Sequence, residues 1–463
     1  MKSLIKNYIF GVVIASLVIA ATAQQQHDYC DVLKKSLMFY KAQRAGRLPD
    51  NDIPWRGNSA LNDSSSGAPR DKNGDGNLSG GYYDAGDHVK FALPMAYTIT
   101  MLAWAYNNNV VKVEQCNLTK LFLEDIKWGS DWLIAAHVSE FEFAAQVGNG
   151  QADHAYWGPP ENMTMDRPTD MISADKPGTE VACEASAALA ATSMAFAQKD
   201  PEYSATCLNH SKQLHVFGDK YRGVYSDVVT DAVTFYKSWS GYKDEIVWSS
   251  VWLYMATNDT QYLTKAQSDY STFAIGALAQ KNSHDWDLKA PGIALLLANL
   301  TGNQSYKADI ESYLKWWMPG GGCPVTPGGL SWIRQWGPCR YAATTAFLAT
   351  VYGGDSYVKW AQSQVNYILG DNPLNMSYVI GVGSKFPLNP HHRASHHSPT
   401  NNIGMPVQNT YELTGALVGG PSQDDSWKDD RTDYVRNEVA DDYNAGLVGV
   451  IATLINKDSK PTN

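Results

Sequence analysis

Helical periodicity is the feature that most restricts the fold of this 463-residue chain. Apolar residues recur at intervals of three, four and seven in several windows after Phe91, and Phe122, Ile126 and Leu133 share one such helical face. An alanine-rich run at 181–197 favours a helix that packs closely on its neighbours. Alternation of polar and apolar residues is scarce. The sequence therefore predicts an all-α fold in which strands are minor.

Further apolar segments with helical spacing follow along the chain. They cover about 95–106, 246–257, 262–280, 291–300, 306–317, 341–352, 358–368 and 444–456. Long polar connections rich in Gly, Pro, Asn and Trp separate the helical segments, at 50–88, 148–178, 316–340 and 371–435. Connections of this length in a compact domain are usually functional. We expect one large domain, a ring of helices whose functional loops gather on one face.

The N-terminus has the pattern of a cleavable secretory signal. Lys2 and Lys6 precede an apolar run that ends in the small residues of Ala21-Thr22-Ala23. The run is shorter than the roughly 20 apolar residues that span a bilayer, although an N-terminal membrane anchor is the alternative. We predict a signal peptide at 1–23, a single mature domain at 24–463 and secretion of the mature protein.

Cysteines and glycosylation triplets agree with an oxidising, extracellular compartment. Six cysteines allow 15 pairings, and spacing does not choose among them. Cys323 and Cys339 bracket a segment rich in Pro and Gly, so we expect these two to form a disulfide. Nine Asn-X-Ser/Thr triplets are candidate N-glycosylation sites: Asn62, Asn77, Asn117, Asn162, Asn209, Asn258, Asn299, Asn303 and Asn375.

Net charge restricts the partners. The formal charge is −10, and no basic stripe interrupts it. An acidic chain of this kind is poorly suited to bind nucleic acid or an anionic membrane. The chain has 15 Trp and 26 Tyr, whose flat apolar faces and polar edges suit stacking on sugar rings, although ordinary core packing uses the same residues.

Two aspartates three residues apart mark the first candidate site. Asp84 and Asp87 lie in the Gly- and Tyr-rich stretch 80–90, just before an apolar helical segment. Two carboxylates in a tight turn are able to hold a water molecule, a metal ion or a sugar hydroxyl together. A helix N-cap and a turn aspartate would explain the same residues without any chemistry.

A second acidic cluster lies near the C-terminus, at 427–446. Glu438 stands there beside Val439 and Ala440, among other carboxylates and at the start of an apolar helical segment. Like charge and partial burial raise the pKa of a carboxyl group, which suits a general acid. A solvated acidic loop is the alternative.

Four histidines and an arginine lie between the two acidic regions, within 391–397. Their spacing does not match a zinc motif, so hydrogen bonding to sugar hydroxyls is favoured over metal binding. A structural histidine loop is the alternative for His392, His396 and His397.

Three separated stretches together resemble the catalytic domain of glycoside hydrolase family nine, a family of cellulases. They are Ser-Gly-Gly-Tyr-Tyr-Asp-Ala-Gly-Asp at 79–87, the segment 377–393 that ends in Pro-His-His-Arg, and the segment 429–445 that contains Asn-Glu-Val-Ala. The resemblance implies an (α/α)6 barrel with long loops that form an open substrate cleft on one face. It also implies a secreted endo-β-1,4-glucanase that acts on cellulose or soluble β-1,4-glucans with inversion of anomeric configuration. A non-catalytic glucan-binding wall or coat protein on the same scaffold is the alternative.

The resemblance also implies catalytic roles. Asp87 matches the base that deprotonates the attacking water, Asp84 the partner that helps hold this water, and Glu438 the general acid. An inverting enzyme needs its base and its acid on opposite sides of the sugar. Asp84 and Asp87 lie in one turn and so occupy the same side, which leaves Glu438 for the other.

Further positions match residues around the family's site. The catalytic group includes His391 and Asp429, and the substrate-binding group comprises Arg393, Tyr443, Trp157, His154, Trp286 and Trp332. For each of the three tryptophans, packing inside a loop is the alternative.

The stretch 240–245 resembles a structural calcium loop found in several members of the family. Ser240, Gly241, Asp244 and Glu245 would be ligands, with Asp287 as a distant one, because carboxylates and carbonyls suit a hard cation. An acidic turn at a helix N-terminus is the alternative. In the loop that carries Trp286, Leu288 stands where the resemblance would imply an acidic residue, so this loop departs from the family pattern. We expect catalysis to need no cofactor and the protein to be a monomer whose partner is a β-1,4-glucan.

Overall fold

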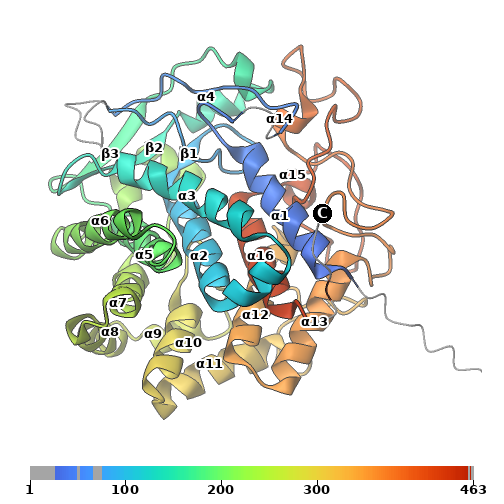
Figure 1. Cartoon of the computed structure of the whole chain (residues 1–463). Helices are drawn as coiled ribbons and strands as arrows, with labels where there is room; N and C mark the ends of the chain where they lie inside the picture. Colours follow the sequence, from blue (N-terminus) through green and yellow to red (C-terminus); the bar gives the residue numbers. More distant parts are fainter. Residues whose placement is uncertain (1–26, 50–52, 66–75, 457–458, 460–463) are drawn as a thin grey trace, which may run out of the picture.

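The computed structural model describes residues 27–49, 53–65, 76–456 and 459 (Figure 1). The predicted signal peptide at 1–23 lies outside these residues. Within the described part of the chain, no helix combines the length and the apolar character needed to cross a bilayer.

Six helices form a closed inner ring. They are α2 (Ala92–Gln115), α5 (Thr179–Phe196), α7 (Lys243–Thr257), α10 (Ala290–Thr301), α12 (Pro338–Tyr352) and α16 (Asp441–Leu454). Each packs on the next in this order, and α16 packs back on α2. A helix that is buried all round needs no polar face. This explains the alanine-rich run in α5, whose residues from Thr179 to Ser193 are all buried.

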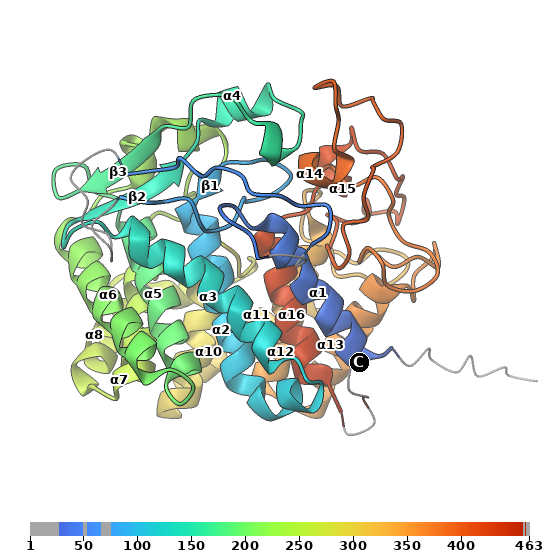
Figure 2. The ribbon, with the colours of Figure 1, turned by 45° about the horizontal axis from the view of Figure 1, so that its top comes forward.

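Six further helices surround this ring. They are α1 (Tyr29–Gln43), α3 (Thr119–Ala136), α6 (Pro201–Lys220), α8 (Thr260–Thr272), α11 (Gln304–Trp317) and α13 (Asp355–Leu369). Along the chain each outer helix precedes an inner one, and the outer helices pack on the outside of the inner ring (Figure 2). The fold is therefore an (α/α)6 barrel, as expected.

The short elements gather at one end of the barrel, uppermost in Figure 2. They include a three-stranded antiparallel sheet in the order β1-β2-β3, in which Lys90 pairs with Val147 and Phe143 with Ile172. Its strands are β1 (Lys90–Phe91), β2 (Glu142–Val147) and β3 (Thr169–Ser173), and the helical turns are α4 (Gly150–His154), η1 (Pro160–Asn162), η2 (Tyr225–Asp227), η3 (Thr230–Thr234), α14 (Arg393–His396) and α15 (Tyr434–Asn437). Strands are minor, as predicted.

One predicted helix is divided. The segment 262–280 holds α8 and the short α9 (Ile275–Ala279), because Ala274 between them is left-handed with φ 54°.

The predicted disulfide between Cys323 and Cys339 is wrong. Both of these thiols are free and buried, and the disulfide joins Cys30 to Cys116 with a Cα–Cα distance of 5.4 Å. Cys30 lies in the first turn of α1 and Cys116 caps the C-terminus of α2. The two helices run in opposite directions, so the start of one meets the end of the other.

Candidate active site

Asp84 is a buried carboxyl in the turn that leads into β1. Its Oδ2 accepts a hydrogen bond from the hydroxyl of Tyr236, whereas its buried Oδ1 has no hydrogen-bond partner among the described residues. Burial raises the pKa of Asp84 well above its ordinary value, and the charges of Asp442 and Glu438 raise it further. One carboxyl oxygen is thus left for a molecule that enters the site.

Asp87 lies between two nitrogen donors. Its Oδ1 pairs with Arg393, and its Oδ2 is 2.9 Å from Nδ1 of His154. Arg393 is itself buried, with its guanidinium 4.5 Å from the ring centre of Trp157 and its Nε 2.8 Å from the carbonyl oxygen of Tyr156. Two of the predicted substrate-binding residues, Arg393 and His154, therefore contact the predicted base, and a third, Trp157, packs on Arg393.

Glu438 is the C-cap of α15, and its carboxyl group accepts two hydrogen bonds. Its Oε2 lies 2.8 Å from the indole Nε1 of Trp336 and 3.4 Å from the hydroxyl of Tyr443. Burial raises the pKa of Glu438, and the charge of Asp442 adds to this, whereas the donors and the guanidinium of Arg340 oppose it. Its surroundings therefore favour retention of a proton.

Backbone hydrogen bonds join the three sequence stretches. The N–H of Arg393 donates to the carbonyl of Gly86 at 3.0 Å, and the N–H of His391 donates to the carbonyl of Asn437 at 2.9 Å. A Cβ on Gly86 would overlap the carbonyl of His391, so only glycine lets the two loops approach this closely. The turn that carries Asp87 and the segment that carries Glu438 thus meet on either side of the histidine loop.

His391 is a neutral imidazole, and its Nε2 has no hydrogen-bond partner within the part of the chain that the structure describes. Its Nδ1 donates to the carbonyl of Arg431 at 2.8 Å, since a carbonyl only accepts, and burial lowers its pKa to about 4. Its Nε2 is therefore an acceptor.

Asp429 shapes the loop that leads to His391. Its carboxylate accepts from the N–H of Leu388 at 3.1 Å, and from the N–H and the side-chain amide of Asn389 at 2.9 and 3.0 Å. Among the described residues, its carboxylate accepts hydrogen bonds from this loop alone.

The three tryptophans predicted to bind substrate each contact other residues of the protein. Trp157 donates to Nδ1 of His396 at 2.6 Å, Trp332 donates to the carbonyl of Pro421 at 3.0 Å, and the buried Trp286 packs edge-on against Tyr236.

Two other tryptophans present more open surface. Trp336 is 46% exposed and Trp239 is 76% exposed. Sequence reasoning did not single out either of them, nor Tyr236, which contacts Asp84. Only the clustering of Tyr236 and Trp239 in one polar loop, 235–241, was available as a signal.

Three of the predicted calcium ligands lie together: the Oγ of Ser240 is 3.5 Å from Oδ1 of Asp244, 3.4 Å from Oδ1 of Asp287 and 2.6 Å from the carbonyl oxygen of Asp287. Asp287 Oδ1 already accepts from Ser238 Oγ at 2.9 Å and from two backbone N–H groups, and Asp244 accepts from the backbone N–H of Lys289 at 2.7 Å. Glu245 pairs instead with the ammonium group of Lys289 at 3.1 Å. Across the described ranges, no cluster of three or more His, Cys, Asp or Glu residues is arranged to hold a metal ion.

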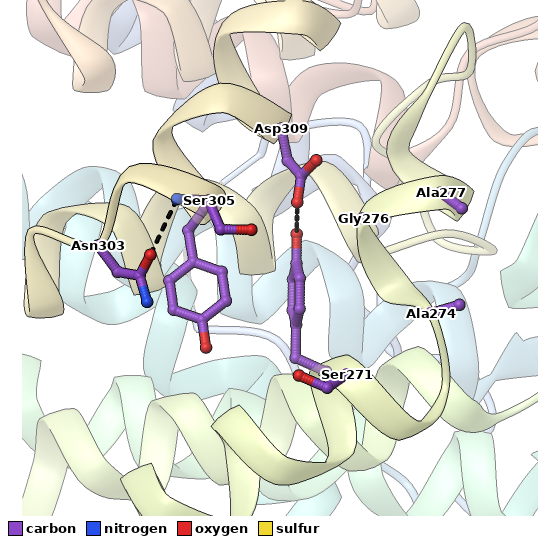
Figure 3. Close-up of a pocket in the computed structure, with 9 residues that line it drawn as sticks. Ser271, Ala274, Gly276, Ala277, Asn303, Ser305 and Asp309 are labelled. Carbon is purple, nitrogen blue, oxygen red and sulfur yellow. Dashed lines mark hydrogen bonds between the residues drawn. The ribbon is translucent and has the colours of Figure 1, made fainter.

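A separate pocket of about 350 Å³ lies among α8, α9 and α11 (Figure 3). Tyr270 donates to Asp309 there at 2.7 Å. None of the predicted site residues lines this pocket.

Comparisons with known proteins find relatives that match nearly the whole chain. An endoglucanase of Dictyostelium discoideum is 58% identical over 460 residues, which are 99% of this chain and 64% of that protein, so the chain spans less than two thirds of its length. The structure of a termite endoglucanase from Nasutitermes takasagoensis has a TM-score of 0.87 at 44% identity, covering 93% of this chain and 99% of the other. Endoglucanase CelQ of Clostridium thermocellum, complexed with cellotetraose, has a TM-score of 0.85 at 37% identity, covering 95% and 72%.

A family model described as glycosyl hydrolase family 9 matches residues 29–451. This range contains every helix of both layers of the barrel except the last three residues of α16. It also contains all three stretches that meet at the candidate site. The chain belongs to glycosyl hydrolase family 9.

Proposed function

We propose that this chain is a secreted endo-β-1,4-glucanase that hydrolyses cellulose or soluble β-1,4-glucans with inversion. The observation that carries the proposal is the meeting of the Asp84–Asp87 turn with Glu438 at the loop end of the barrel. The relatives named endoglucanases support the reaction, and the cellotetraose complex of CelQ supports the substrate class.

Asp87 is the base in this proposal. Arg393 and His154 hold both of its oxygens, so its carboxylate has one orientation from which to take a proton from water. The free Oδ1 of Asp84 accepts the other hydrogen of the same water. The water oxygen attacks the anomeric carbon from the face opposite the leaving group, which inverts the configuration.

Glu438 is the acid. It gives its proton to the glycosidic oxygen as the bond from this oxygen to the anomeric carbon breaks, and its raised pKa keeps that proton available. The donors Trp336 and Tyr443 orient the carboxyl group, and the resulting carboxylate is stabilised by the same two hydrogen bonds. The Nε2 of His391 accepts a hydrogen bond from a sugar hydroxyl.

Two substitutions and one stereochemical measurement test the reaction. Asp87→Asn and Glu438→Gln should each abolish release of reducing sugar from carboxymethylcellulose while cello-oligosaccharide binding persists. Proton NMR of the first product from a cello-oligosaccharide should show the α-anomer. Near wild-type activity in either variant, or a β-anomer formed first, would remove these roles. A protein that only sediments with insoluble cellulose would support the non-catalytic alternative.

Catalysis in this proposal uses no cofactor, and the working form is a monomer. We keep structural calcium at 240–245 in the proposal, because Ser240 lies beside the carboxylates of both Asp244 and Asp287. Melting in EDTA and in calcium checks this, and we expect the lower Tm in EDTA. The same Tm in both would remove the site.

A further inference from the structure

Gln43, at the C-terminal end of α1, contacts the turn that carries Asp84 and the loop that carries His392. It is 1% exposed, and its side-chain Nε2 donates to three consecutive carbonyls, those of Tyr83 at 3.1 Å, Asp84 at 3.0 Å and Ala85 at 2.8 Å. The backbone carbonyl of Gln43 also accepts from the N–H of Tyr83 at 2.9 Å. The turn that carries Asp84 is therefore anchored to the end of an outer helix.

The other end of the same amide holds the histidine loop. The Oε1 of Gln43 accepts from Nε2 of His392 at 2.7 Å, and Nδ1 of His392 accepts from the N–H of Ser395 at 3.1 Å. These bonds fix one tautomer of His392, and burial lowers its pKa well below the ordinary value, so the ring is neutral. The three carbonyls likewise fix which end of the Gln43 amide is the donor.

His392 lies between His391, whose backbone joins the Glu438 segment, and Arg393, which pairs with Asp87. A single buried amide thus spans the gap between the segment of the predicted base and the loop that leads to the predicted acid. In an inverting enzyme the separation of base and acid must admit one water molecule. A displacement of about 1 Å at such a site costs on the order of 100-fold in rate.

We propose that Gln43 is a positioning residue for this reaction, acting through the turn 83–85 and through His392 to set the spacing between Asp87 and Glu438. The inference rests on the proposed glucanase function. Gln43 touches neither the substrate nor the reacting atoms, so its loss should lower kcat and leave binding of the sugar chain largely intact.

Gln43→Leu is compared with a matched control, Asn372→Leu. Asn372 is 8% exposed, and its amide donates at 2.7 Å to the carbonyls of Tyr367 and Met376 and accepts from the N–H of Leu374. Both variants remove a buried amide that organises a loop, and none of the partners of Asn372 is a predicted site residue. On a soluble cello-oligosaccharide we expect Gln43→Leu to lose roughly 100-fold in kcat with KM within about threefold of wild type. Asn372→Leu should lose a similar amount of Tm and keep its kcat.

Gln43→Glu is the second variant, in case Gln43→Leu does not fold. Its protonated carboxyl still donates one hydrogen bond to the carbonyls and accepts one from His392, whereas its carboxylate would face three carbonyl oxygens. The ratio of its kcat to the wild-type kcat should therefore fall as the pH rises.

Equal kcat in Gln43→Leu and Asn372→Leu, or a ratio for Gln43→Glu that stays flat with pH, would overturn the inference. A wild-type protein that releases no reducing sugar would instead overturn the proposed function, so the two failures are distinguishable.

Discussion

Replacement of Tyr236 by Phe should move the acidic limb of the pH–rate profile. The Tyr236 hydroxyl donates to Oδ2 of Asp84, and this bond opposes the rise in the pKa of Asp84 that burial causes. The Tyr236 ring packs on Phe91 with ring centres 4.8 Å apart and on Trp286 at 4.9 Å, and Phe keeps both contacts. The substitution therefore removes one hydrogen bond and leaves the packing in place, which raises the pKa of Asp84 further.

The size of the shift follows from the kind of bond that is lost. A hydrogen bond to a charged group contributes about 1.5–3 kcal/mol. At about 1.36 kcal/mol per pH unit, its loss raises the pKa of the carboxyl group by roughly one to two units. The assay is kcat/KM on a soluble cello-oligosaccharide from about pH 4 to pH 8, in which the acidic limb should move to higher pH by that amount.

Tyr313→Phe is the matched control for this experiment. Tyr313 is also a buried tyrosine, and its hydroxyl pairs with Oγ1 of Thr345 at 2.8 Å, away from the predicted site residues. The acidic limb of the Tyr313→Phe profile should coincide with that of the wild type. If the limb of Tyr236→Phe coincides with both, the ionised form of Asp84 is not needed for the reaction and the assigned role is wrong.

Three further predictions concern other parts of the molecule. Trp336→Phe removes the indole donor that lowers the pKa of Glu438, so the basic limb of kcat should move to higher pH. Burial raises the pKa of Glu180 from 4.5 to about 8, so the native state holds a proton that the unfolded chain has lost, and stability falls as the pH rises through this window. Glu180→Gln should therefore flatten the dependence of Tm on pH between these values. Cys30→Ser removes the bond to Cys116 and should lower the free energy of unfolding by about 2–5 kcal/mol in a denaturant titration.

The sequence predicted the inner ring better than the outer one. Inner helices such as α5 and α10 are buried on nearly every side and are rich in Ala and Leu, so their apolar segments are easy to recognise in the sequence. Periodicity did not single out α1 and α6, because both carry many charged and polar residues on their outer faces. The cap signals were present: Asp200 caps α6 and Pro201 is its first residue, a pairing that marks a helix N-terminus.

The residues of the candidate site also fall into two groups, those that the sequence predicted and those that it did not. The carboxyl groups of Asp84, Asp87 and Glu438 were predicted because each lies in a distinctive local pattern, and the structure brings their segments together. Tyr236 and Trp336 were missed because a loop residue reveals its partner only after the barrel has closed. The pairing of Cys30 with Cys116 was missed for a similar reason, since it depends on which helix ends are neighbours in space.

The alternation of outer and inner helices also explains why so many carboxyl groups can share one end of the barrel. Every inner helix follows an outer one, so all six run in the same direction, and α2, α12 and α16 begin at the loop end. A helix N-terminus carries a partial positive charge that stabilises a nearby carboxylate by about 0.3–1 kcal/mol. Asp87 lies just before α2, and Glu438 lies just before α16, whose first residues are Asp441 and Asp442. The guanidinium of Arg340, in the first turn of α12, adds a full charge 2.8 Å from Asp442. Carboxyl groups that would repel one another on an ordinary surface are thus tolerated together, because the barrel topology directs several helix N-termini at the same place.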